Sequence, residues 1–236
     1  MKWFCALLFS LIVIFTVSEA KALPIYESQK QIGFTYRVIK KGDSFYKLFK
    51  GKWGIVARFN RMDEKHLIVG MRIKVPNNLE NLIEYAPMPE SLERAKGEQR
   101  YILVDLKEQF LGLYEYGVLK FSAPISSAHP ACCYTPPGRF QVRALHRDHV
   151  SSIYKDATSG ENIPMPFASL FYIESTPNGK TSYWIHGGDL PGYPDSHGCV
   201  RVSTEDAKRV YEWLGGNLDS DEIVWIRNGV PIEIVD

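Results

Sequence analysis

Cys199 and His186 are the two side chains of this sequence whose types and spacing suggest covalent chemistry. A free thiol has a pKa near ~8.5, so a nucleophilic cysteine needs a neighbour that takes its proton or stabilises its thiolate. An imidazole, with a pKa near ~6.5, can do both. Cys199 lies in the run Ser-His-Gly-Cys-Val-Arg at 196–201, and His186 lies shortly upstream. We therefore interpret this segment as the site of a cysteine-dependent acyl transfer.

The residues between His186 and Cys199 predict a chain reversal that brings the two side chains together. Residues 183–185 are apolar and β-prone, so we expect a short strand there. Glycines and prolines at 187–194 then turn the chain in a hairpin-like return. Gly198 allows close approach of a reacting carbonyl, and the backbone N–H groups of Gly198 and Cys199 are candidates for an oxyanion hole. Arg201, two residues further along an extended stretch, is expected on the same side and is a candidate to hold a substrate carboxylate.

Several motifs, in this order along the chain, resemble the catalytic domain of the YkuD-type L,D-transpeptidases, which are bacterial cell-wall enzymes. The family carries a Thr-Pro-Thr/Pro-Gly turn, a Met-Pro-aromatic segment, and a His-Gly pair followed by Ser/Thr-His-Gly-Cys, an apolar residue and Arg. The corresponding stretches here are Thr135-Pro136-Pro137-Gly138, Met165-Pro166-Phe167, Ile185-His186-Gly187 and Ser196-His197-Gly198-Cys199-Val200-Arg201.

The resemblance implies that Cys199 attacks the amide between the third residue of a donor stem peptide and its terminal D-alanine. The resulting thioester would then pass to an amine acceptor. It also implies that His186 takes the thiol proton and that the carbonyl of Gly187 orients the imidazole. The residues expected around the substrate and the oxyanion are Gly198, Arg201, Ser196 and His197, the last being a weaker candidate for catalysis. The implied partners are peptidoglycan stem peptides and glycan, and no metal or organic cofactor is required.

Three acceptors remain open within this reaction class. Another stem peptide gives cross-linking, a lipoprotein lysine gives anchoring, and water gives carboxypeptidase activity. A non-enzymatic wall-binding protein with a decayed catalytic domain is the competing class.

A zinc site is a further alternative, because five side chains could supply ligands: His146, His149, His186, His197 and Cys199. The pair His146-x-x-His149, however, lacks a companion Cys-x-x-Cys or a glutamate-bearing His-x-x-x-His helix. We interpret His129, His146 and His149 as polar loop residues.

The N-terminus predicts export. Lys2 precedes an apolar run at 3–17, and small residues follow, which is the layout of a signal peptide over residues 1–22. An uncleaved anchor is the alternative, although fifteen apolar residues are short for a span of about 20. We expect the remainder in the periplasm or cell wall, with membrane contact only through such an anchor. The net charge of +1 gives no electrostatic case for nucleic acid.

Three cysteines would remain after signal removal, which is an odd number for an oxidising compartment. Cys132 and Cys133 are adjacent, just before the Thr135 turn. They are either a strained vicinal disulfide or two unpaired loop thiols, and Cys199 is the thiol expected to stay free.

Residues 35–78 predict a separate small α+β domain of order βααβ. We expect a strand at 36–39, a helix with Phe45 and Phe49, a second helix ending near Asn60, and a strand over 66–76. The stretches 36–44, 59–61 and 70–76 resemble the LysM module, whose usual ligand is the N-acetylglucosamine-containing glycan of peptidoglycan. A purely structural spacer is the alternative.

The remainder predicts a mainly β catalytic domain over 101–228. Short strands are expected at 101–106, 110–115, 118–121 and 223–226, with a helix that begins at the capping box Ser203-Thr204-Glu205-Asp206 and ends at Gly215. The family resemblance implies a β-sandwich-like fold with a covering loop, for which 143–168 is the candidate. Glutamate-rich residues 79–100 are interpreted as a linker or docking segment, and 229–236 as a tail.

Overall fold

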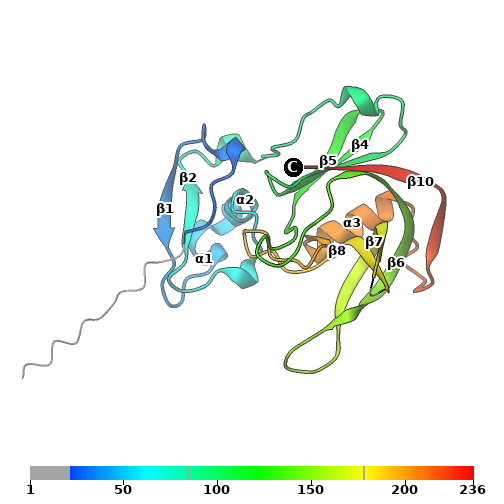
Figure 1. The fold of residues 1–236 in the computed structure, drawn as a ribbon. Helices are drawn as coiled ribbons and strands as arrows, with labels where there is room; N and C mark the ends of the chain where they lie inside the picture. The colour runs from blue at the N-terminus through cyan, green and yellow to red at the C-terminus, as the bar shows by residue number, and fades with distance from the viewer. Residues whose placement is uncertain (1–21, 84, 178) are drawn as a thin grey trace, which may run out of the picture.

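The computed structural model describes residues 22–83, 85–177 and 179–236, which form a small N-terminal module and a larger, mainly β domain (Figure 1). Apart from Ala22, the predicted signal segment lies outside the described residues. No helix in these described ranges is long and apolar enough to cross a membrane.

The N-terminal module has the predicted order of strand, two helices and strand. These elements are β1 (Phe34–Val38), α1 (Phe45–Phe49), α2 (Trp53–Phe59) and β2 (Arg72–Pro76), and β1 pairs antiparallel with β2. Phe45, Val56 and Ile73 are buried between them. Asn60 ends α2 and fixes β2, because its side chain donates to the Lys74 carbonyl and accepts from the Lys74 N–H.

The second strand of the module is shorter than the sequence pattern predicts. It begins at Arg72, and Glu64–His66 forms a 3₁₀ turn instead. The side chain of Asp63 caps this turn by accepting the backbone N–H groups of Lys65 and His66 at 3.0 and 3.2 Å. The hydrogen bonds of Asp63 therefore favour a turn at residues 64–66, where the sequence pattern predicted the start of a strand.

The larger domain is built on one eight-stranded sheet of order β5-β4-β3-β10-β6-β7-β8-β9. Its strands are β3 (Tyr101–Asp105), β4 (Phe110–Glu115), β5 (Val118–Pro124), β6 (Gly138–Lys155), β7 (Asn162–Thr176), β8 (Gly179–Gly187), β9 (Val200–Val202) and β10 (Val224–Val235). The predicted strands at 101–121 are all present.

The predicted tail at 229–236 is wrong, because β10 continues to Val235 in the middle of the sheet. It runs parallel to β3 and antiparallel to β6. Val230, Ile232 and Ile234 alternate into the core, and burial of this apolar face accounts for the longer strand.

The two ends of the sheet share one hydrophobic core, in agreement with the predicted sandwich-like fold. Leu111 and Leu113 from β4 and Val200 and Val202 from β9 belong to the same buried cluster, so the sheet curls over itself. The helix α3 (Thr204–Trp213) contributes to this core, and Ser203 caps it as predicted by accepting the Asp206 N–H.

The segment 79–100 docks on the large domain and is not a free linker. Met88, Leu92 and Ala95 are buried against residues of β3 and β4. The Leu92 N–H also donates to the carbonyl of Gly117 at 2.7 Å. Apolar side chains among the glutamates thus give this segment a buried face.

The predicted covering segment 143–168 is a long β-hairpin of β6 and β7 and not an irregular loop. It projects from the sheet as the green-to-yellow arm of Figure 1. Asp156 organises its turn by accepting the backbone N–H groups of Thr158 and Ser159.

Candidate active site

The pairing of β8 with β9 brings the two halves of the cysteine motif together. The strands are parallel, with Ile185 opposite Val200 and His186 opposite Arg201. The chain therefore returns by a crossover and not by the hairpin-like turn expected from the sequence. Ile185 and Val200 point into the core, and the alternate side chains of His186, Cys199 and Arg201 line a cleft of about 390 Å³ on the other face.

His186 is held in one orientation by its neighbour. Its Nδ1 lies 2.9 Å from the carbonyl oxygen of Gly187 and the side chain is buried. A carbonyl only accepts hydrogen bonds, so Nδ1 carries a proton and Nε2 of the neutral ring keeps its lone pair. Burial lowers the pKa of His186 to about 4, with the Gly187 carbonyl opposing part of that effect. The imidazole is therefore neutral at pH 7.

Cys199 packs against an apolar cluster that includes Trp184. Burial raises the pKa of the thiol to about 11, although hydrogen bonding with the Trp184 backbone and the charge of Arg201 both favour the thiolate. At pH 7 the cleft therefore holds a protonated thiol and a neutral imidazole. Such a pair needs a general base at the moment of attack and not a pre-formed ion pair.

Ser196 stabilises the loop before the nucleophile. Its Oγ accepts the Gly198 N–H at 3.1 Å and donates to the Cys199 carbonyl at 2.5 Å. The Gly198 amide is thereby engaged and does not point freely into the cleft, which argues against its predicted part in an oxyanion hole. Gly198 has φ of +138°, and a Cβ there would lie 2.9 Å from the Tyr183 ring, so glycine is required.

The Thr135 turn lies directly beside this loop. Thr135 Oγ1 donates to the Gly198 carbonyl at 2.9 Å and accepts the Ala128 N–H at 3.0 Å. The turn and the cysteine run, which are separate motifs in the sequence, therefore form one hydrogen-bonded unit.

Arg201 presents a guanidinium to the cleft. One terminal nitrogen, Nη2, lies 3.2 Å from Asp195 Oδ2, and buried Nε has no hydrogen-bond partner among the described residues. Its side-chain stem packs on Gly188, where a Cβ would approach Arg201 Cδ to 3.0 Å. The position and the spare N–H suit recognition of an anionic group.

His197 lies at the rim of the cleft and is exposed. Its ring stacks on Tyr154 of the hairpin at 4.4 Å between centroids. This contact links the cysteine loop to the β6–β7 arm and separates His197 from the buried position of His186.

The structure adds His149 to the cleft, where the sequence interpretation missed it. His146 and His149 lie in β6 and not in a loop, and the His149 ring packs on the Trp184 ring at 4.1 Å between centroids. Burial, assisted by His146, lowers the pKa of His149 to about 4. The Met-Pro-aromatic segment could have indicated the position of His149, because Met165 of that segment pairs with His149 across the β6–β7 hairpin. His129 does lie in a loop, as expected.

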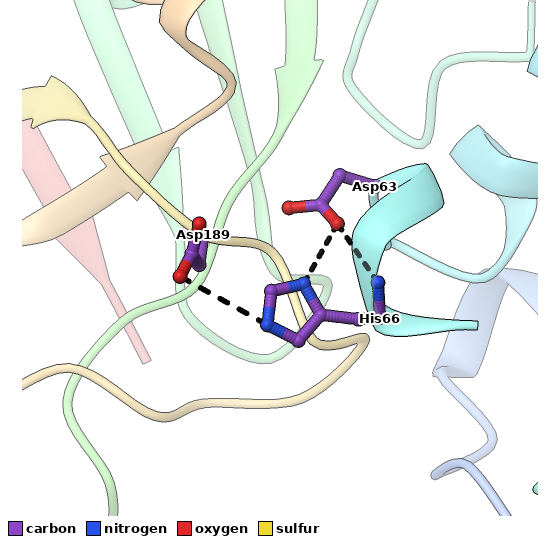
Figure 2. A group of neighbouring side chains, drawn as sticks. All are labelled: Asp63, His66 and Asp189. Atoms are coloured by element: carbon purple, nitrogen blue, oxygen red, sulfur yellow. Dashed lines mark hydrogen bonds and ion pairs between the residues drawn. The ribbon is translucent and has the colours of Figure 1, made fainter. Parts of the chain in front are cut away.

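The zinc alternative receives no support at the cysteine. In the described part of the chain, the ligand-type side chains that gather closely enough for a metal are Asp63, His66 and Asp189, in the module and the loop after β8 (Figure 2). Cys132 and Cys133 are free thiols, which is the second of the two alternatives for this pair.

Comparison with known proteins assigns a family domain to most of the large domain. Residues 99–234 match the family model of the L,D-transpeptidase catalytic domain, YkuD. No curated protein matches the chain.

Solved structures of L,D-transpeptidases resemble the chain at low identity. One from Xylanimonas cellulosilytica is 24% identical, covers 76% of this chain and 78% of its own, and has a TM-score of 0.46. One from Mycobacterium smegmatis is 19% identical, covers 58% and 59%, and has a TM-score of 0.44. L,D-transpeptidase 3 from Mycobacterium tuberculosis with a faropenem-derived adduct is 20% identical, covers 58% and 60%, and has a TM-score of 0.43. The chain thus spans less than two thirds of the two mycobacterial structures.

Proposed function

Because the chain belongs to the YkuD family of L,D-transpeptidases, we propose that it is a peptidoglycan L,D-transpeptidase with Cys199 as its nucleophile. The observation that carries this proposal is the parallel pairing of β8 with β9, which places His186 and Cys199 in one cleft with His186 fixed by the Gly187 carbonyl.

Acylation begins when Cys199 Sγ attacks the carbonyl carbon between the third residue of the donor stem and its terminal D-alanine. His186 Nε2 accepts the thiol proton as the S–C bond forms, and a tetrahedral oxyanion results. When the C–N bond breaks, His186 returns that proton to the leaving D-alanine amine. The product is a thioester on Cys199.

Transfer reverses these roles. An acceptor amine attacks the thioester carbonyl, His186 takes a proton from that amine, and the thiolate leaves and regains the proton. The raised pKa of Cys199 and the lowered pKa of His186 leave both groups uncharged at pH 7, so in this proposal the thiol proton moves as the S–C bond forms and not before the attack. With the Gly198 amide bonded to Ser196, the Cys199 amide becomes the candidate oxyanion donor.

Arg201 is the proposed contact for a carboxylate of the donor stem. Its buried Nε retains an unused N–H, and Asp195 and Gly188 hold the side chain in place. A fixed guanidinium that already lies at the cleft gives binding energy with little loss of rotamer freedom.

The N-terminal module is proposed as a LysM-like glycan-binding domain, and the mature chain as a protein of the periplasm or cell wall. Exposed Tyr46 lies on α1, and exposed Ile68 and Val69 lie on the loop before β2. Backbone hydrogen bonds between Ile39 and residues 70–71 join that loop to the end of β1. Exposed aromatic and aliphatic side chains of this kind suit the apolar face of a sugar ring.

The test is incubation of the mature chain, residues 23–236, with defined tetrapeptide muropeptides, followed by mass spectrometry. We expect loss of D-alanine through a thioester on the Cys199 peptide, and cross-linked dimers as the product. A product shortened by D-alanine without dimers would assign water as the acceptor, and a lysine-bearing lipoprotein peptide tests anchoring. Absence of any product and of any thioester would refute the proposed activity.

A further inference from the structure

The N-terminal module forms hydrogen bonds with the loop that joins His186 to Cys199. The Asp63 N–H donates to the Leu190 carbonyl at 2.9 Å, and Asp63 Oδ2 accepts the Leu190 N–H at 2.9 Å. Met62 forms an isolated antiparallel bridge with Pro191 in the same place. One residue of the module thus pairs with both backbone groups of one loop residue.

The loop is shaped for this approach. The Tyr26 hydroxyl donates to the Gly192 carbonyl at 2.9 Å. Gly192 has φ of +93°, and a Cβ there would lie 2.9 Å from Leu23 and 3.0 Å from the Asn60 carbonyl. Any larger residue would therefore push the loop away from the module.

The two halves of the loop have different supports. The end nearer Cys199 is held by the large domain, because Ser126 Oγ donates to the Tyr193 carbonyl and the Asp195 N–H donates to the Ser127 carbonyl. The hydrogen bonds to Leu190 and Gly192, by contrast, come from the N-terminal side of the chain.

Asp63 and His66 are joined by hydrogen bonds, Asp189 faces His66 across this contact, and the group is not a ready metal centre (Figure 2). Asp63 Oδ1 already accepts from His66 Nδ1 at 2.7 Å and from two backbone N–H groups, and Oδ2 accepts from Leu190. His66 Nε2 and Lys65 Nζ each lie 4.0 Å from the Asp189 carboxylate on the loop. The charges across the contact are complementary.

We propose that Asp63 is a positioning residue for catalysis, acting through Leu190 to hold the loop between His186 and Cys199. The idea rests on the proposed function for its effect on turnover. Docking of the module itself has an independent support, because Arg61 is fully buried and forms an ion pair with Glu108 of the large domain at 3.0 Å. Loss of the Asp63 side chain should therefore loosen the loop at Leu190 without detaching the module.

Asp63→Ser in the mature chain separates the two roles of the carboxylate. Serine is also a favourable cap for the 64–66 turn, but it is too short to reach Leu190 as well. Asp43→Ser is the matched control, because Asp43 caps an exposed turn in the same module by accepting the Lys40 N–H. Hydrogen exchange of the Leu190 N–H, which Asp63 Oδ2 accepts in the wild type, should be about tenfold faster in Asp63→Ser and unchanged in Asp43→Ser.

Two further measurements test how loss of the Asp63 side chain changes the reactivity of Cys199 and the turnover of muropeptides. A loosened loop admits water, so the thiol pKa should fall toward its ordinary value, and iodoacetamide should label the Cys199 peptide faster at pH 8. Turnover of muropeptides should nevertheless fall, with kcat reduced about tenfold and KM changed less than about threefold. A merely structural role of Asp63 would leave the labelling profile of the folded variant unchanged.

Unchanged exchange and labelling in folded Asp63→Ser, or equal changes in Asp43→Ser, would overturn the proposal. If Asp63→Ser does not fold, Tyr26→Phe removes only the hydroxyl on Gly192 and should still speed exchange of the loop by about threefold. Unchanged exchange in that variant would also overturn it. Wild-type protein without activity on muropeptides would refute the proposed function alone, because exchange and labelling test the loop contact without substrate.

Discussion

Thr135 donates a hydrogen bond of 2.9 Å to the carbonyl of Gly198, the residue directly before the nucleophile. Both residues are buried, and the same hydroxyl accepts the Ala128 N–H. The position of Cys199 thus depends on a turn more than sixty residues earlier in the chain.

Thr135→Val should weaken catalysis and stability together. Valine keeps the shape of threonine but leaves the Gly198 carbonyl and the Ala128 N–H without this partner, at a cost of about 1–3 kcal/mol in the free energy of unfolding. We expect turnover to fall about tenfold or more, because the nucleophile loop is no longer fixed. Thr176→Val is the control, since Thr176 makes the same type of bond to the Gly179 carbonyl in an exposed turn. Urea unfolding and muropeptide kinetics measure both effects, and equal behaviour of the two variants would contradict the prediction.

Cys199→Ala should abolish turnover and thioester formation while leaving the fold intact. Alanine fills most of the space of the thiol in its apolar cluster, so we expect only a small change in thermal stability. Mass spectrometry of the intact protein after incubation with substrate is the measurement. Undiminished product from a folded variant would remove Cys199 from the mechanism.

His186→Asn should cost about 10²-fold or more in turnover, because the group that accepts the thiol proton is lost. His197→Asn should cost much less, since His197 lies exposed at the rim and contacts Tyr154. The measurement is the turnover rate of each variant with the same muropeptide. Equal losses in two folded variants would place the general-base role of His186 in question.

Acid should destabilise the protein through His186 and His149. The pKa of His186 and that of His149 are each lowered to about 4 in the folded chain, against an ordinary value of 6.5. Between those values the unfolded state binds more protons, so stability is fully present above pH 6.5 and falls as pH drops toward 4. Thermal unfolding between pH 7 and 4.5 should show a smaller loss for His149→Gln than for wild type. The same loss in both would show that His149 does not contribute.

The local signals of the sequence were sufficient for much of the catalytic domain. The strands at 101–121 and the capped helix after Ser203 form where the pattern predicts them, because alternation and capping act within a few residues. His186 and Cys199 of the cysteine motif both line one cleft, and their catalytic roles stay a prediction.

Long-range contacts explain what the sequence did not reveal. The pattern Val230, Ile232, Ile234 alternates, but its partners β3 and β6 lie far away in the chain, so its central place in the sheet was not apparent. Arginine is usually found on the surface, yet docking of the module buries the Arg61 side chain completely against Glu108. Such pairings depend on tertiary contacts that no local pattern encodes.

Glycan binding by the module can be tested at a single exposed ring. Tyr46 is 70% exposed on the first helix of the module, where no described contact requires it for folding. If it stacks on a sugar, Tyr46→Ala should lower sedimentation of the full mature chain with purified sacculi by about threefold or more, while muropeptide turnover stays near wild type. Tyr116→Ala is the matched control, because Tyr116 is 61% exposed on the turn between β4 and β5 of the large domain. Equal sedimentation of wild type and both variants would leave the module as a support for the catalytic loop and remove its role as a glycan-binding domain.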